Sequence, residues 1–77
     1  PIHYQCGADK QDVWLTFYAT SLPAVIVKNN DQYSEAFMGP LSRGVKYTSH
    51  ELTVVERKQA ATIHWDDKTL DCQQRAD

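Results

Sequence analysis

Three features are scarce in this 77-residue chain: cysteine, long apolar runs and an excess of positive charge. There are two cysteines, and no apolar run approaches the roughly 20 residues that a membrane-spanning helix needs. The net charge is -2, with eight lysine and arginine residues against ten acidic ones. Nucleic-acid binders present a broad basic surface, so this composition argues against a nucleic-acid partner. A mildly acidic chain instead suits a cationic partner, which it would attract through electrostatic steering.

The two cysteines, Cys6 and Cys72, lie near opposite ends of the chain. A chain of this length can form one small domain, residues 1–77, and such domains usually need a covalent staple. A disulfide between them would close a loop of roughly 65 residues and stabilise the fold by about 4 kcal/mol in the chain-entropy model. It would also indicate an oxidising compartment. The alternative is two unrelated buried thiols.

Short strand-like segments alternate with turn residues along the whole chain. In 13–19 the alternation is clear, with Val13, Leu15 and Phe17 on one face of a strand and Trp14, Thr16 and Tyr18 on the other. Further strands are expected at 2–6, 24–29, 32–38, 44–49, 52–56, 61–66 and 69–72. We therefore predict an all-β fold, a small antiparallel barrel of about eight strands, because closure removes exposed strand edges. The alternative for 33–39 is a turn of helix.

The residue types that perform catalysis or bind metals are present but scattered. Candidates for an acid–base or nucleophilic site are His50, His64, Ser42 and the pair Asp66–Asp67. His64 is expected to face solvent, and two adjacent carboxylates in a turn rarely aim at one bond. Two distant cysteines and three scattered histidines do not match zinc-ligand spacing. We predict a protein that is not an enzyme and has no metal site or cofactor.

The stretch 40–60 collects half of the positive charge. It holds four cations against two acidic residues, a charge of +2, whereas the rest of the chain holds four against eight, a charge of -4. The cations of the stretch are Arg43, Lys46, Arg57 and Lys58. They gather around two turns, 42–44 and 57–59, and alternate turns of an antiparallel meander emerge at one end of the sheet. Two such loops would suit an anionic cleft; the alternative is a solvated rim.

The sequence resembles the bacterial C-type lysozyme inhibitor family (MliC/PliC). The segments "YQC" and "DC" resemble the opening and closing strands of the family, with its terminal disulfide. "RGVKYTS" resembles its S-G-x-x-Y signature, in which Gly44 and Tyr47 match. "VVERKQAAT" resembles a second motif, an aromatic-rich strand, a K-G turn and an Ala-led strand, in which Ala61 matches. The resemblance covers nearly the whole chain.

The chain departs from both motifs. Arg43 stands at the signature serine, with Ser42 beside it. Arg57 stands at the lysine of the second motif, Lys58 at its glycine, and Val55 at the aromatic position before them.

The resemblance implies an eight-stranded barrel in the periplasm or on the outer membrane that blocks C-type lysozyme. The sequence leaves both a monomer and a homodimer open. In the family, the two loops enter the lysozyme cleft, where a hydroxyl and a cation meet the catalytic carboxylates. The residues that the resemblance assigns to lysozyme binding are Ser42, Arg43, Gly44, Tyr47, Arg57 and Lys58. A second hypothesis is a cell-envelope binding module of the same fold that recognises another partner, such as a wall glycan, and a third is a small hydrolase.

Overall fold

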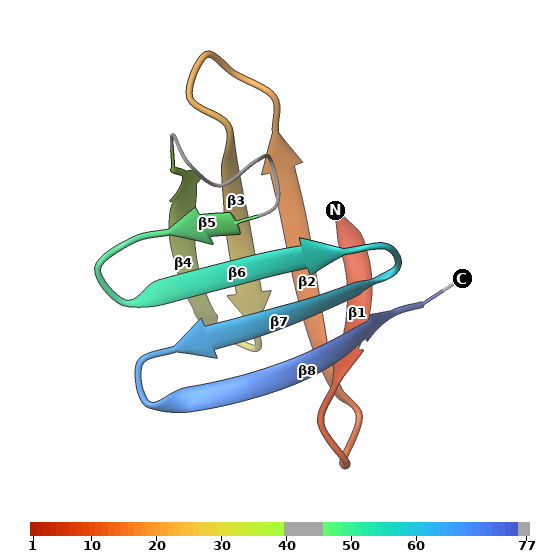
Figure 1. Cartoon of the computed structure of the whole chain (residues 1–77). Coiled ribbons are helices and arrows are strands. Elements are labelled where there is room, and N and C mark those ends of the chain that lie inside the picture. Colours follow the sequence, from red (N-terminus) through yellow and green to blue (C-terminus); the bar gives the residue numbers. More distant parts are fainter. Residues whose placement is uncertain (40–45, 76–77) are drawn as a thin grey trace.

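The computed structural model describes residues 1–39 and 46–75. Within these residues it contains eight strands in a closed antiparallel barrel, in which each strand pairs with the next and β8 returns to β1 (Figure 1). The strands are β1 (Ile2–Cys6), β2 (Gln11–Tyr18), β3 (Ala24–Asn29), β4 (Gln32–Met38), β5 (Lys46–Thr48), β6 (Leu52–Arg57), β7 (Ala60–Trp65) and β8 (Lys68–Gln74). The predicted fold class is therefore confirmed.

The barrel is built as two crossing halves. In Figure 1, β1–β4 run at a steep angle to β6–β8, so the wall turns a corner between β4 and β5. The corner is narrow: β4 and β5 pair at only two positions, Phe37 with Thr48 and Met38 with Tyr47. The described part of the chain contains no helix that could cross a membrane.

The interior is filled by alternate side chains from every strand, as period-2 patterning requires. On β2, Val13 and Leu15 are fully buried and Phe17 packs against them at the rim of the core, as predicted. The corresponding inward set on β7 is Ala61, Ile63 and Trp65. Apolar burial of this kind is worth about 25 cal/mol per Å², so the alternation supplies the main driving force for closure.

The disulfide joins the first strand to the last. Cys6 on β1 lies directly opposite Cys72 on β8, and both residues are buried in the core. The prediction of a terminal staple is confirmed, and the alternative of two free thiols is wrong. Because this bond lies on the seam where β8 meets β1, it fastens the strand pair that closes the barrel.

Tight turns connect the hairpins, and four of them place a non-glycine residue in the left-handed region, including Lys10 (φ 54°) in the β1–β2 turn. Asn30 (φ 57°) and Asp66 (φ 57°) are the first residues of two-residue turns, where short polar side chains are favoured. In the β6–β7 turn the residue with positive φ is Gln59 (φ 60°). Gln59, one position after Lys58, therefore adopts the left-handed conformation that glycine usually adopts in such turns.

Some predicted boundaries were wrong. β2 begins two residues early, at Gln11, and β8 extends past Cys72 to Gln74. Both extensions pair with β1, Gln11 opposite Cys6 and Gln74 opposite Tyr4, so backbone pairing rather than side-chain pattern sets them. The helical alternative for 33–39 is also wrong, because Gln32–Met38 is a strand paired with β3.

Candidate partner-binding site at the basic end of the barrel

Strand order places the connections alternately at two ends of the barrel. The β2–β3, β4–β5 and β6–β7 connections share one end with the start of β1 and the end of β8. The β1–β2, β3–β4, β5–β6 and β7–β8 connections share the other. We call these the basic end and the acidic end, for the charges described next.

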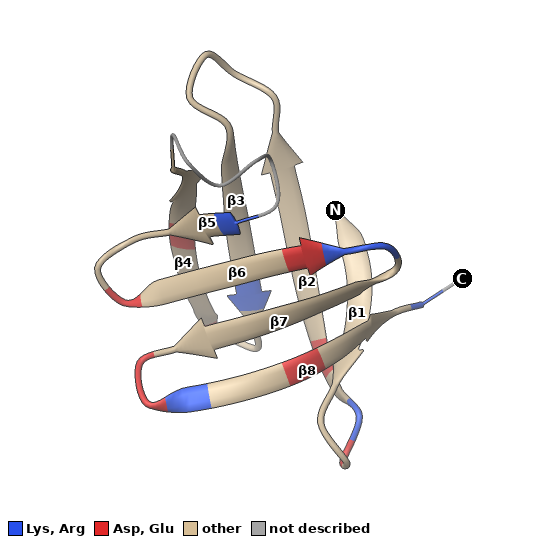
Figure 2. Cartoon of the chain, viewed as in Figure 1, with Lys and Arg blue, Asp and Glu red and all other residues tan. Residues whose placement is uncertain are grey.

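The basic end gathers four cations of the described chain: Lys46, Arg57, Lys58 and Arg75. Lys46 pairs with Val55 in the β5–β6 ladder, which brings it beside the β6–β7 turn. The C-terminal segment reaches the same turn, because the backbone N–H of Gln74 donates to the carbonyl of Gln59 at 2.9 Å. Figure 2 shows these cations on and around that turn. Segments from three parts of the sequence thus form one basic surface.

The acidic end carries the opposite charge. Its turns hold five acidic residues, Asp9, Asp31, Glu51, Asp66 and Asp67, which outnumber the two cations of this end, Lys10 and Lys68. The β5–β6 and β7–β8 turns touch, since the N–H of Asp66 donates to the carbonyl of Glu51 at 2.9 Å. Figure 2 shows the red turns of this end on the far side of the hairpins from the blue β6–β7 turn. The barrel is therefore polarised, although its net charge is only -2. Such a charge separation orients a molecule in the field of a charged partner.

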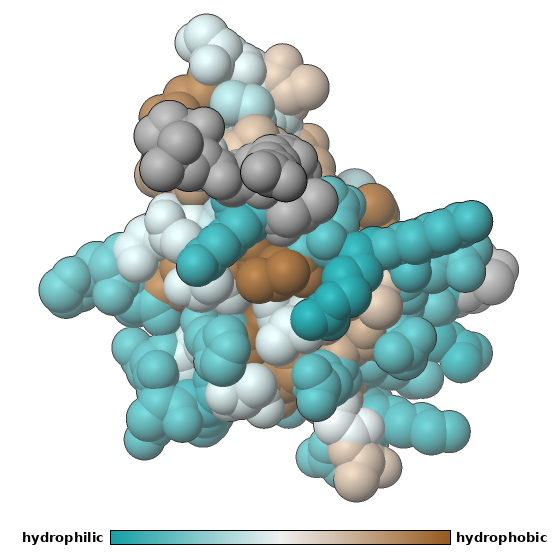
Figure 3. Space-filling view, in the orientation of Figure 1, coloured by the Kyte–Doolittle hydropathy of each residue, from teal (hydrophilic) through white to brown (hydrophobic). Residues whose placement is uncertain are grey.

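Lys46 on β5 and Arg57 on β6 lie on the outer face of the same strand pair. Lys46 stands opposite Val55 and Arg57 follows Val55 by two residues, so their Cβ atoms are diagonal neighbours at about 7–8 Å. Nη1 of Arg57 donates a hydrogen bond of 2.7 Å to the hydroxyl of Thr62 on β7. Figure 3 shows that this face is largely hydrophilic, with hydrophobic atoms confined to small areas. The two cations are thus exposed on a polar surface.

Inside the same end lie two tyrosines and a carboxylate. Burial raises the pKa of Tyr4 and of Tyr47, and the negative charge of Glu56 raises each further. Tyr47 is only 6% exposed, and its ring packs against Phe17 with centroids 5.7 Å apart. Any contribution of Tyr47 to binding is therefore indirect: it anchors β5, and with it Lys46, to the core.

The remaining site residues predicted from the sequence are placed as follows. Ser42, Arg43 and Gly44 lie outside the described residues. Arg57 ends β6 and Lys58 forms the turn after it, and both are exposed. Lys46 and Arg75, which the predicted site did not include, join this surface. Lys46 could have been found from its place in the basic stretch, whereas Arg75 reaches it only through the pairing of β8.

The candidate catalytic residues do not form a site in the described structure. His64 is exposed on the outside of β7, where its Nδ1 atom lies 2.9 Å from the hydroxyl of Thr69. His50 and the pair Asp66–Asp67 lie in separate turns at the acidic end. Nowhere in residues 1–39 and 46–75 do three histidine, cysteine or acidic side chains gather in a way that could hold a metal ion.

Comparisons of this chain with protein-family models, with curated proteins and with solved structures gave no match. The family resemblance of the sequence therefore stays a prediction.

Proposed function

We propose that this protein is an inhibitor of C-type lysozyme that places the loops of its basic end in the active-site cleft of the enzyme. The single observation that carries the proposal is the pairing of Lys46 with Val55, because it brings Lys46, the first residue of β5, to the same surface as the cations of the β6–β7 turn. In this proposal the protein acts in the bacterial periplasm or on the outer membrane, where it protects peptidoglycan. It has no catalytic activity of its own.

The chemistry of the target explains why cations are needed. A retaining glycosidase carries two carboxyl groups that flank the scissile bond, one acting as an acid and one ionised. A guanidinium pairs with a carboxylate through two parallel hydrogen bonds, which an ammonium cannot reproduce. Arg57, with Lys58 as the second cation, would occupy the place of the substrate. It would also lower the pKa of the general acid, which must stay protonated for catalysis.

The β4–β5 loop supplies the second half of the proposed contact. Ser42 is assigned the hydroxyl that faces the catalytic carboxylates, and Arg43 is the alternative group for that position. Gly44 is assigned a conformational role in this loop, as the resemblance implies. Tyr47 supports the loop from the core, where it is buried against Phe17.

The charges of the protein would act at two ranges. The net charge of -2 would attract a lysozyme with a basic surface at long range, whereas the basic end would be attracted only close to the acidic cleft. This would affect the association rate more than the final affinity. It also explains how a protein with a net charge of -2 can recognise a pair of carboxylates.

The test is lysis of bacterial cell walls by hen-egg-white lysozyme in the presence of the protein. We expect inhibition by the wild type that weakens in Arg57→Ala and in Ser42→Ala but not in Lys68→Ala, a cation at the acidic end. Full lysis at a large excess of the protein would contradict the proposal. It would favour the second hypothesis, a cell-envelope binding module of the same fold. Breakdown of wall material without lysozyme would instead indicate a hydrolase.

A further inference from the structure

A flat aromatic face covers the outside of β2, β3 and β4, away from the basic hairpins. The ladders align its outward residues in three rows, each running across the three strands. The rows are Trp14–Lys28–Tyr33, Thr16–Ile26–Glu35 and Tyr18–Ala24–Phe37. An aromatic residue stands at each of the four corners of this grid.

The four corner rings are exposed to solvent. Trp14 is 41% exposed, Tyr18 44%, Tyr33 63% and Phe37 38%, and the described residues contain one other exposed large hydrophobic residue, Leu22. Single exposed apolar residues are ordinary, but a cluster on one face of a small barrel indicates a binding surface. From strand geometry, the corners are separated by about 13 Å along a strand and about 10 Å across the three strands.

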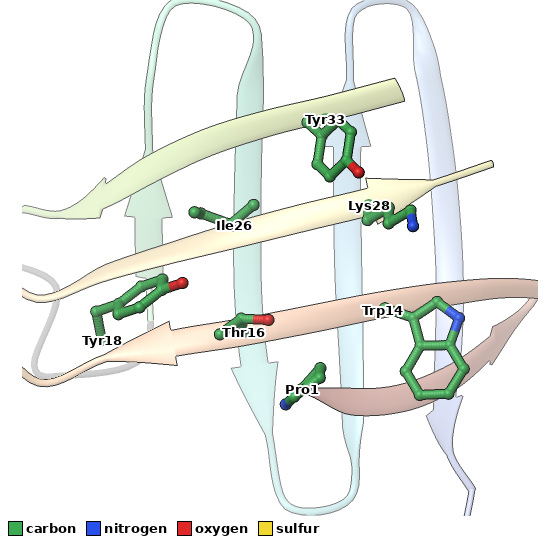
Figure 4. A pocket seen from close by; sticks show the side chains of 7 residues that line it. All are labelled: Pro1, Trp14, Thr16, Tyr18, Ile26, Lys28 and Tyr33. Atoms are coloured by element: carbon green, nitrogen blue, oxygen red, sulfur yellow. The ribbon is translucent and has the colours of Figure 1, made fainter. Parts of the chain in front are cut away.

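A groove of about 370 Å³ lies among three of these rings, Trp14, Tyr18 and Tyr33 (Figure 4). It is lined by Pro1, Trp14, Thr16, Tyr18, Ile26, Lys28 and Tyr33. Its size falls in the range of about 300–1,000 Å³ that is typical of ligand sites. Figure 4 shows that the aromatic rings alternate with polar atoms: two phenol hydroxyls, the indole nitrogen, the Thr16 hydroxyl and the Lys28 ammonium.

The largest ring of the groove is held in place by its neighbours. His3 on β1 stacks on Trp14 with centroids 4.3 Å apart and planes 13° from parallel. Nε2 of His3 lies 2.7 Å from a carboxylate oxygen of Asp12, which fixes the imidazole in turn. On the other side, the Lys28 ammonium lies 5.5 Å from the centre of the Tyr33 ring. A ring already held in position loses little side-chain entropy when a ligand binds.

The charge of this face decides between classes of ligand. Lys28 is the one charged side chain among the lining residues, and Glu35 lies one row away on the same face. Single-stranded nucleic acids need a row of cations beside the stacking rings, and anionic membranes need a cluster of lysine or arginine. A sugar ring without charge has an apolar C–H face that can lie on an aromatic ring, and an edge of hydroxyls for the polar atoms between the rings.

We propose that this face is a binding site for an uncharged oligosaccharide. Trp14 and Tyr18 are the stacking platforms, Tyr33 closes the groove on β4, and Thr16 and Lys28 bond to sugar hydroxyls. The groove lies on the outside of β2–β4 and its lining does not include Arg57 or Lys58 of the β6–β7 turn, so it does not depend on lysozyme inhibition.

The test is binding of the purified full chain to immobilised neutral hexasaccharides: cellohexaose, maltohexaose and the hexamer of N-acetylglucosamine. We expect binding to at least one of them, weakened about tenfold or more by Trp14→Ala and by Tyr18→Ala. Trp14→Phe should retain most of the binding, because it keeps a ring. Leu22→Ala is the matched control, since it removes an exposed apolar side chain outside the groove. Equal melting temperatures would show that the variants fold.

A further arm establishes that the ligand is uncharged. An increase in salt from about 0.01 M to about 1 M, which shortens the Debye length from about 30 Å to about 3 Å, should change the affinity less than about threefold. Failure of all three hexasaccharides to bind would overturn the proposal. So would equal binding by the wild type and Trp14→Ala, or preferential, salt-sensitive binding to heparin or oligothymidine. A wild-type dimer that Trp14→Ala converts to monomer would assign the face to self-association instead. No arm contains lysozyme, so failure here is distinct from failure of the inhibitor proposal.

Discussion

The guanidinium of Arg57 is held by the hydroxyl of Thr62, its hydrogen-bond acceptor across the β6–β7 hairpin at 2.7 Å. The Thr62 hydroxyl in turn lies 3.5 Å from a carboxylate oxygen of Asp71 on β8, to which it donates. These two hydrogen bonds hold Arg57, the most important cation of the proposed inhibitory surface, on the outside of the barrel. A guanidinium that is already positioned loses less freedom when it meets a carboxylate.

Thr62→Val should therefore weaken inhibition of lysozyme by about twofold to tenfold, the equivalent of one hydrogen bond of about 0.5–1.5 kcal/mol. Thr62→Ser keeps the hydroxyl and should inhibit like the wild type. Thr69→Val is the matched control, because Thr69 makes its hydrogen bond to His64 instead. Inhibition constants from cell-wall lysis measure the effect. Unchanged inhibition by Thr62→Val would show that this bond does not position Arg57 for binding.

Removal of the disulfide should destabilise the fold strongly. Cys6 and Cys72 are separated by 66 residues, and a bond across a loop of that length stabilises by about 4 kcal/mol in the chain-entropy model. Urea unfolding of the double variant Cys6→Ala and Cys72→Ala should show a loss of this size. The wild type in reductant should behave in the same way. A loss below about 1 kcal/mol would mean that the β1–β8 ladder closes the barrel without the bond.

Gln59→Gly should stabilise the protein by up to about 1 kcal/mol, because relief of about 1–2 kcal/mol of strain is partly offset by the freedom that glycine adds to the unfolded chain. Gln59 has φ 60°, a conformation that costs about 1 kcal/mol or more for a residue with a Cβ atom and nothing for glycine. Lys58→Gly, one position earlier, is the control, because Lys58 is not among the residues with positive φ. There glycine only adds freedom to the unfolded chain and should lower stability by about 0.5–1 kcal/mol. Thermal or urea unfolding gives both values, and the same sign for both variants would contradict this reading of the turn.

The stability that the Asp12 carboxylate contributes should be lost in acid. The hydrogen bond from His3 lowers the pKa of the Asp12 carboxyl, and Gln5 and the charges of His3 and Arg75 add to this effect. A group whose pKa is depressed in the folded state stabilises above its unfolded pKa of about 4, and this stability is lost as the pH falls through the folded pKa. The difference in unfolding free energy between the wild type and Asp12→Asn should therefore shrink as the pH falls below about 4. Urea unfolding over this range measures it, and a difference that does not change with pH would count against the His3–Asp12 bond.

Much of the fold could be predicted because strand periodicity is local. The apolar alternation in 13–19 predicted the inward side of β2, and three predicted strands, 2–6, 24–29 and 32–38, have the observed bounds. The polar ends of β2 and β8 could not be predicted. Gln11 and Gln74 carry no pattern of their own, and they belong to strands only because β1 pairs with them on both sides.

The surfaces were harder to predict, because they depend on register between strands. The sequence analysis put Trp14, Thr16 and Tyr18 on one side of a strand, but only the ladders to β3 and β4 bring Tyr33 and Phe37 to the same face. The basic turns were visible as a charged stretch. That the opposite end is acidic follows from the alternation of turns around the closed barrel.

The most direct test of the inhibitor proposal compares two charge reversals that change the net charge equally. One reverses two cations at the basic end, Lys46→Glu with Arg57→Glu, and the other reverses two cations at the acidic end, Lys10→Glu with Lys68→Glu. Inhibition of hen-egg-white lysozyme is measured for both variants at one ionic strength. We predict that the first loses about 100-fold or more in inhibition, because like charges at a desolvated contact cost several kcal/mol, and that the second stays within about threefold of the wild type. An equal loss in both variants, or none in the first, would contradict the account.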